Sequence, residues 1–114
     1  MSRSTTIAAT LTVALFASAA LQAEERTTDE FCEKFAQATE TIMRAHQNGH
    51  PMSVLLRNAD ETLSGIPLLL KAYRLAVMEA YSRPRYSTER IQQRVIAEFR
   101  DENHLSCLKG MTGK

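Results

Sequence analysis

Residues 66–82 read IPLLLKAYRLAVMEAYS, and this stretch decides the fold. Its apolar and aromatic residues recur at the three- and four-residue spacing that places side chains on one face of an α-helix. Leu68 and Leu75 fall on the opposite face, so that little of the helix surface is polar. A helix that is apolar over most of its circumference usually has neighbours on more than one side. We therefore expect residues 66–82 to form the central helix of the domain.

A second helical pattern lies upstream, over residues 28–48. Thr27 stands three positions before Glu30, which is a capping-box pattern at a helix start. Gly49 can adopt the left-handed conformation past a helix end, and Pro51 prevents the helix from continuing. The sequence thus predicts an amphipathic helix with both of its ends marked.

The segment between these two helices allows several interpretations. Ser53 is the expected N-cap of a short helix over residues 52–59. One short helix, two helices or an irregular connection would all agree with the pattern of residues 53–65. Pro67 suits the first turn of the central helix, where its missing N–H is not needed.

The last part of the chain predicts one more helix. Pro84 ends the central helix because it disfavours helical geometry in the residue before it. Ser87 is the expected N-cap of a helix from about residue 88, with Phe99 on its inward face, and residues 110–114 are the expected loose tail. No segment has the two-residue period of a strand. The fold class is therefore all-α: a small antiparallel helical bundle of three main helices plus a short one.

The first residues have the pattern of a secretory signal peptide. Residues 7–21, IAATLTVALFASAAL, carry no charge and are shorter than the roughly 20 residues that cross a bilayer. We expect a signal peptide over residues 1–23, cleaved after Ala23, with Ala20 as a second candidate. An uncleaved anchor or a buried N-terminal helix is the alternative. Residues 24–114 would then form a single helical domain that is periplasmic or secreted.

The charge of the mature chain is balanced. The full sequence has 14 Lys and Arg against 13 Asp and Glu, and removal of Arg3 with the signal peptide leaves 13 against 13. Proteins bind nucleic acid mainly through net positive charge, so we expect no nucleic-acid partner. After signal cleavage we also expect no stable membrane insertion.

The two cysteines, Cys32 and Cys107, are expected to form a disulfide. In a small exported protein two cysteines are usually joined, whereas a cytosolic chain would keep two separate thiols. The bond would close a loop of about 75 residues, for which the chain-entropy model gives roughly 4 kcal/mol of stabilisation. The bond needs the two Cα atoms within about 7 Å, and antiparallel first and last helices would provide that distance.

Histidines offer the clearest alternative chemistry. His46 and His50 have the spacing of a helical zinc site, and His104 could add a third ligand. Gln47, however, stands where the metalloprotease pattern has its glutamate, and Gly49 is expected to end the helix between the two histidines. No nucleophile is paired with a base and no glycine-rich phosphate loop is present. We therefore expect no catalytic residue, no cofactor and no metal.

The exit of the central helix is the candidate binding surface. Arginines and tyrosines crowd the link and the start of the last helix, and both residue types are typical interface anchors. The alternative is that the arginines stabilise the helix end and stack on the tyrosines. The residues of this candidate surface are Tyr81, Arg83, Arg85, Tyr86, Arg90 and Arg94.

Three segments follow the signal-peptide pattern: CEKFAQATETIMRAHQNGHPMS, KAYRLAVMEAYSRPRYSTE and AEFRDENHLSC. Together with that pattern they resemble a group of small exported proteobacterial proteins that are often encoded in phage or prophage regions. The resemblance implies an exported helical protein with one cysteine pair, and it implies no particular activity. Many of these proteins have an aromatic residue near the last cysteine, where this chain has His104 and Leu105. The shared residues are Cys32, Ile42, Met43, Gly49, Met52, Ser53, Ala80, Tyr81, Pro84, Phe99 and Cys107.

These patterns favour a non-enzymatic module that binds another protein, as an inhibitor, an immunity factor or a chaperone-like protein would. A disulfide-linked scaffold with one surface rich in arginine and tyrosine is the reason. A metal-binding protein or enzyme that uses His46, His50 and His104 is the competing hypothesis.

Overall fold

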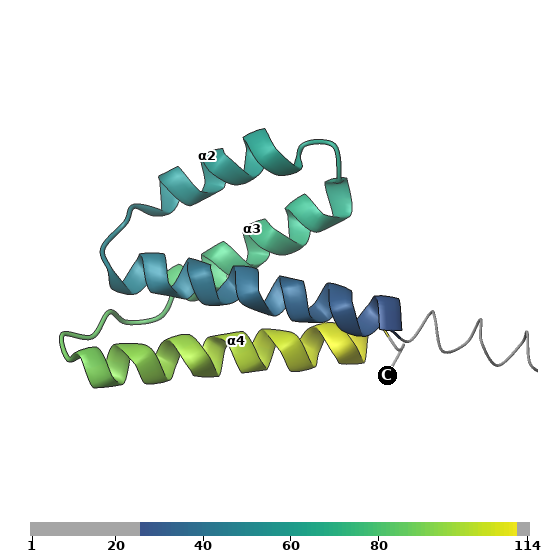
Figure 1. Cartoon of the computed structure of the whole chain (residues 1–114). Coiled ribbons are helices and arrows are strands. Elements are labelled where there is room, and N and C mark those ends of the chain that lie inside the picture. The colour runs from purple at the N-terminus through teal and green to yellow at the C-terminus, as the bar shows by residue number, and fades with distance from the viewer. Residues whose placement is uncertain (1–25, 112–114) are drawn as a thin grey trace, which may run out of the picture. The chain divides into compact units, whose positions relative to one another are not determined.

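The computed structural model describes residues 26–111, which form four helices and contain no strand. The N-terminal helix covers residues 26–47, and the others are α2 (Met52–Leu63), α3 (Pro67–Tyr81) and α4 (Glu89–Met111) (Figure 1). The all-α prediction is confirmed. The expected signal peptide and both candidate cleavage sites lie outside the described residues.

The chain divides into two units, residues 1–31 and residues 32–114. Of the first unit the structure describes only residues 26–31, which are helical. Within the second unit the N-terminal helix and α4 run antiparallel, and α2 and α3 form an antiparallel hairpin (Figure 1). The predicted antiparallel bundle of three main helices and a short one is therefore present. None of the described helices is long and apolar enough to cross a membrane.

Buried apolar side chains from all four helices meet in one core. The N-terminal helix contributes most, because its residues at successive turns from Cys32 to Gln47 are buried. By contrast, α3 buries fully only Ala76, Val77 and Ala80, so the expectation that it is covered on several sides is wrong. The core cluster consists of Ile42, Met43, Leu55, Ala76, Val77, Ala80, Ile96 and Phe99.

The N-terminal helix ends as its sequence predicts. Gly49 has φ +85°, in the left-handed region. The N–H of Gly49 donates to the carbonyl of His46, and the N–H of His50 donates to the carbonyl of Ala45, both at 3.0 Å. This pair of bonds is a Schellman motif, which satisfies carbonyls that the end of a helix would otherwise leave open.

Three predicted N-caps differ from the structure. Thr27 lies inside the N-terminal helix, which is already helical at residue 26. Helix α2 begins at Met52 with Pro51 as N-cap, so Ser53 is within its first turn. The carbonyl of Thr88, and not that of Ser87, accepts the first helical bond of α4, from Gln92 at 2.9 Å. For α2 and α4 the predicted cap is within one or two residues of the observed N-cap, which is the usual uncertainty of a helix boundary.

The structure also shows which form residues 53–65 take and how far the last helix extends. Helix α2 is one continuous helix as far as Leu63, followed by a short turn, and Pro67 is in the first turn of α3 as expected. Helix α4 continues to Met111, so Gly110 is helical and not part of a loose tail. The polar run at residues 100–104 lies within this unbroken helix.

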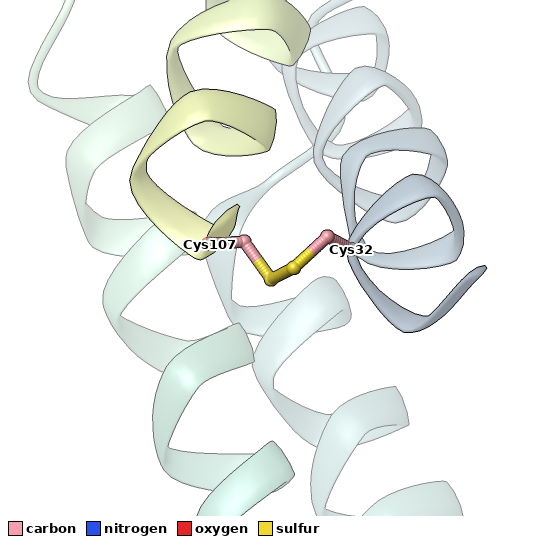
Figure 2. Close-up of a disulfide and its surroundings, with 2 residues drawn as sticks. All are labelled: Cys32 and Cys107. Carbon is pink, nitrogen blue, oxygen red and sulfur yellow. A yellow bond between two sulfur atoms is a disulfide. The ribbon is translucent and has the colours of Figure 1, made fainter. Parts of the chain in front are cut away.

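Cys32 and Cys107 form the predicted disulfide, with their Cα atoms 5.5 Å apart. Figure 2 shows the bond joining the two helices that carry them. Cys32 is fully buried. The bond closes a loop that spans 75 positions of the sequence, so it connects the beginning and the end of the second unit.

An ion-pair network also connects the N-terminal helix with α4. Arg100 of α4 donates to Glu40 of the N-terminal helix at 2.9 Å, and Arg44 donates to the other oxygen of Glu40 at 3.2 Å. The hydrogen bond from Arg100 lowers the pKa of Glu40, and Arg44 adds to this effect. The carboxylate of Glu40 thus links two arginines on two helices.

Glu40→Gln is expected to lower the melting temperature by a few degrees at pH 7 and by progressively less in acid. Because the folded pKa of Glu40 lies below its unfolded value, its contribution is complete above the unfolded pKa of about 4.3 and is lost as the pH falls through the folded pKa. Thermal melts between pH 7 and pH 3 would measure the difference. Glu33→Gln, on an exposed position of the same helix, is the control, and an equal, pH-independent loss in both variants would contradict this role.

Candidate binding surface

The link between α3 and α4 is held by a buried glutamine. Gln47 is almost fully buried at the end of the N-terminal helix. Its Nε2 donates to the carbonyl of Pro84 at 2.9 Å, and its Oε1 accepts the N–H of Tyr86 at 2.9 Å. One side chain thereby pairs a backbone donor and a backbone acceptor of the link, as a neighbouring strand would. The conformation of residues 84–86 depends on this contact.

His46 makes the adjoining contact. Its ring Nε2 lies 2.6 Å from the carbonyl oxygen of Arg83, and since a carbonyl only accepts, this nitrogen carries the proton. The ring packs against Tyr81 with their centroids 4.3 Å apart and tilted by 48°. The hydroxyl of Tyr81 donates to the carbonyl of His50 at 2.6 Å, and burial raises the pKa of that hydroxyl. His46 and Tyr81 therefore join the end of the N-terminal helix to the end of α3.

Arg83 is committed to contacts within the chain. Its guanidinium donates to Glu102 at 2.8 Å and to Glu79 at 3.1 Å, and lies 4.9 Å from the centre of the Phe99 ring. The hydrogen bond with Glu102 raises the pKa of Arg83, with Glu79 adding to this effect. Arg85 reaches the carbonyl of Gln47 at 3.4 Å. Both arginines stabilise the exit of α3.

The six residues of the predicted Arg/Tyr surface thus separate into three groups. Tyr81, Arg83 and Arg85 donate hydrogen bonds to other parts of the bundle. Arg90 and Arg94 are exposed on α4, and their side chains have no hydrogen-bond or ion-pair partner among residues 26–111. Tyr86 is exposed at the link, with its N–H bonded to Gln47. Within the predicted Arg/Tyr surface, the charged side chains available to a partner are therefore those at the start of α4.

The three histidines do not come together. His46 lies 14 residues from Cys32, or about 21 Å along its helix, whereas His104 lies three residues, or about 5 Å, from Cys107. Because the two cysteines are bonded, His46 and His104 lie toward opposite ends of the bundle. His50 is exposed beyond the end of the N-terminal helix. Within residues 26–111 no group of three His, Cys, Asp or Glu side chains could hold a metal ion.

The outer face of α3 is the largest departure from the sequence-based expectation. Leu68 is 85% exposed, Leu75 54% and Met78 46%, although all three are large and apolar. An open groove of about 420 Å³ runs along this face. Its lining residues are Ser64, Pro67, Leu70, Lys71, Arg74, Leu75 and Met78. We call these exposed apolar side chains and the groove the outer α3 face.

Charged side chains border the outer α3 face. Lys71 is exposed and has no ion-pair partner in the part of the chain that the structure describes. Arg74 donates to Asp60 of α2 at 2.9 Å. Glu79 accepts from Arg83, yet its side chain is still 60% exposed. The face therefore combines an apolar centre with a free cation on one side and an accessible carboxylate on the other.

The sequence pattern contained a signal for each missed feature. Gln47 follows Met43 by four positions and thus shares the inward face of its helix, and the Nε2 of Gln47 lies 3.6 Å from the sulfur of Met43. The spacing of Leu68 and Leu75 alone places them opposite the main apolar face of α3. A helix with two apolar faces needs a packing partner on each face, and the described part of the chain packs against only one face of α3.

The fold and this surface together define the class of protein: an all-α bundle with one internal disulfide and an uncovered apolar helix face. Comparison of the chain with protein-family models, with curated proteins and with solved structures found no match.

Proposed function

We propose that this protein is a non-enzymatic module that binds a protein partner through the outer α3 face. The observation that carries the proposal is the exposure of Leu68, Leu75 and Met78 along one side of a single helix. Apolar patches of this kind commonly mark sites where proteins bind other molecules. The groove beside them offers a concave site for an apolar side chain of the partner.

The rest of the bundle supports a binding role by holding this face in place. Helix α3 is anchored through Ala76, Val77 and Ala80 on its opposite side, and its end is fixed by Arg83 and Tyr81. A helix that is already ordered loses little conformational entropy when it binds, which favours affinity. An inhibitor, an immunity factor or a chaperone-like protein would each use such a preformed surface.

The proposed location is the periplasm or the exterior of the cell. A disulfide persists in these oxidising compartments and is rare in the cytosol of most organisms. The signal-peptide pattern of residues 1–23 points to the same location.

Site-specific photo-crosslinking in the exporting cell tests the proposal. A benzoylphenylalanine at position 68, the most exposed apolar position, is expected to form a discrete protein adduct, and the same probe at Glu98 of α4 is the control. Met78→Glu is expected to remove the adduct from position 68, because it places a charge in the apolar face. Equal labelling from both positions, or labelling that Met78→Glu does not change, would refute binding through this face. Mass spectrometry of the adduct identifies the partner.

A further inference from the structure

We propose that the partner on the outer α3 face is a second copy of the same chain, bound as an antiparallel helix pair centred on Leu75. This inference rests on the proposed function, since it names what covers the face assigned to binding. Its support is the distribution of charge and apolar side chains along α3. Two-fold symmetric dimers bring the same patch of both subunits together, so the patch must be complementary to itself.

The charges on α3 meet this requirement. Lys71 and Glu79 stand four residues before and four residues after Leu75, so the three residues form one i±4 ridge of the helix. When two such ridges run antiparallel with Leu75 beside the two-fold axis, Lys71 of each copy comes level with Glu79 of the other. Lys71 has no ion-pair partner among the described residues, and Glu79 is accessible. The pairing therefore forms two equivalent ion pairs at the edges of an apolar contact.

The neighbouring positions fit the same register. Residues three before and three after Leu75 are Ala72 and Met78, so the long side chain of one copy meets a small residue of the other. Seven residues away on each side are Leu68 and Ser82, again an apolar side chain against a small one. Interdigitation of large and small side chains is what ridges-into-grooves packing requires.

The opposite orientation is disfavoured by the same charges. In a parallel pair, Lys71 would face Lys71 and Glu79 would face Glu79 of the second copy. Like charges directly across an interface oppose association, whereas the antiparallel arrangement replaces both repulsions with attractions. Lys71 and Glu79 thus favour the antiparallel orientation of the two copies over the parallel one.

The size of the contact sets the expected affinity. Helix α3 has 15 residues and is therefore about 22 Å long. A contact limited to one such helix from each copy falls below the roughly 1,200 Å² that typical stable interfaces bury. We therefore expect a reversible dimer with a dissociation constant on the order of 10 μM, weakened by salt because its ion pairs are at the rim.

Sedimentation equilibrium of the oxidised mature protein from about 1 μM to 1 mM tests the inference, since that range brackets the expected dissociation constant. Lys71→Glu and Glu79→Lys are each expected to weaken self-association at least about tenfold, because each places like charges across the pair. An equimolar mixture of the two variants is expected to form a heterodimer, since both interfacial pairs are then attractive again. Arg94→Glu and Glu98→Lys, on exposed positions of α4, make the same charge changes away from α3 and are expected to leave the dimer unchanged.

The mixture distinguishes lost pairing from lost folding. Variants that had lost their structure would not recover association when combined, and far-ultraviolet circular dichroism of each variant checks its helix content. A wild-type protein that stays monomeric up to 1 mM, or a mixture that stays monomeric, would overturn the inference. If position 68 then crosslinks to a different protein, the proposed function stands and only the identity of the partner is wrong.

Discussion

Replacement of both cysteines with alanine is expected to lower the free energy of unfolding by about 4 kcal/mol. The Cys32–Cys107 bond closes a loop that spans 75 positions, and it therefore removes a large part of the conformational freedom of the unfolded chain. A small domain is stable by only about 5–15 kcal/mol, so this change takes away a substantial share. Urea denaturation of Cys32→Ala/Cys107→Ala and of the oxidised wild type would measure the difference.

The structure also indicates which region would lose stability first when the disulfide is removed. Helix α4 has two fully buried side chains, Ile96 and Phe99, and three turns of helix follow Phe99. Cys107 is the covalent attachment of these turns to the N-terminal helix. We expect the amides of residues 104–111 to exchange with solvent markedly faster in the double variant, while those around Phe99 change less.

Reduction of the wild type provides the matched control. The reduced protein keeps both native side chains, so its stability is expected to match that of the alanine variant to within about 1 kcal/mol. Equal stability of the oxidised and reduced proteins would show that the loop is already constrained in the unfolded state. A large difference between the reduced protein and the double variant would instead reveal packing of the buried Cys32 side chain.

The features that follow from local chemistry could be predicted from the sequence. Gly49 ends its helix because only a residue without a Cβ enters the left-handed region at little cost. Pro67 begins α3 for an equally local reason. The disulfide was predictable because the chain has only two cysteines and each falls at one end of the helical region.

The relative burial of the helices could not be predicted in the same way. Helix α3 is the more apolar by sequence, but apolarity does not tell whether a neighbour exists on each side. The N-terminal helix is the more buried, and it buries the polar side chains of Thr39, His46 and Gln47. Each of these is paired inside the protein, and burial of a polar group is tolerated only under that condition. The spacing of these residues places them on the inward face of the helix, but it does not show which groups pair with their polar atoms.

Long-range packing also explains why Arg83 and Tyr81, which are part of the predicted binding surface, make contacts inside the protein instead. Arg83 and Tyr81 were identified by their residue types, which are shared by interfaces and by internal contacts. The partners that occupy them, Glu102 and His50, lie 19 and 31 residues away in the sequence. Contacts over such separations depend on the packing of helices, and no local pattern contains them.

Gln47→Ala is expected to lower the free energy of unfolding by about 3 kcal/mol. The substitution removes both hydrogen bonds to the link and leaves the carbonyl of Pro84 and the N–H of Tyr86 without their partner in a partly buried place. Each unsatisfied group costs about 1–3 kcal/mol, and the missing side chain leaves a cavity as well. Chemical denaturation measures the loss, and exchange of the Tyr86 amide reports the link directly. Gln37→Ala, on an exposed position of the same helix, is expected to change stability by less than about 0.5 kcal/mol.

Gln47→Glu separates the two bonds. The variant keeps an oxygen to accept the N–H of Tyr86, but at neutral pH a carboxylate cannot donate to the carbonyl of Pro84. We therefore expect a loss of stability at pH 7 that becomes smaller in acid, since the protonated carboxyl regains a donor. A Gln47→Ala protein with wild-type stability and an unchanged exchange rate at Tyr86 would mean that His46 and Arg83 hold the link without it. In that case the ring nitrogen of His46, 2.6 Å from the carbonyl of Arg83, would be the contact that fixes the exit of α3.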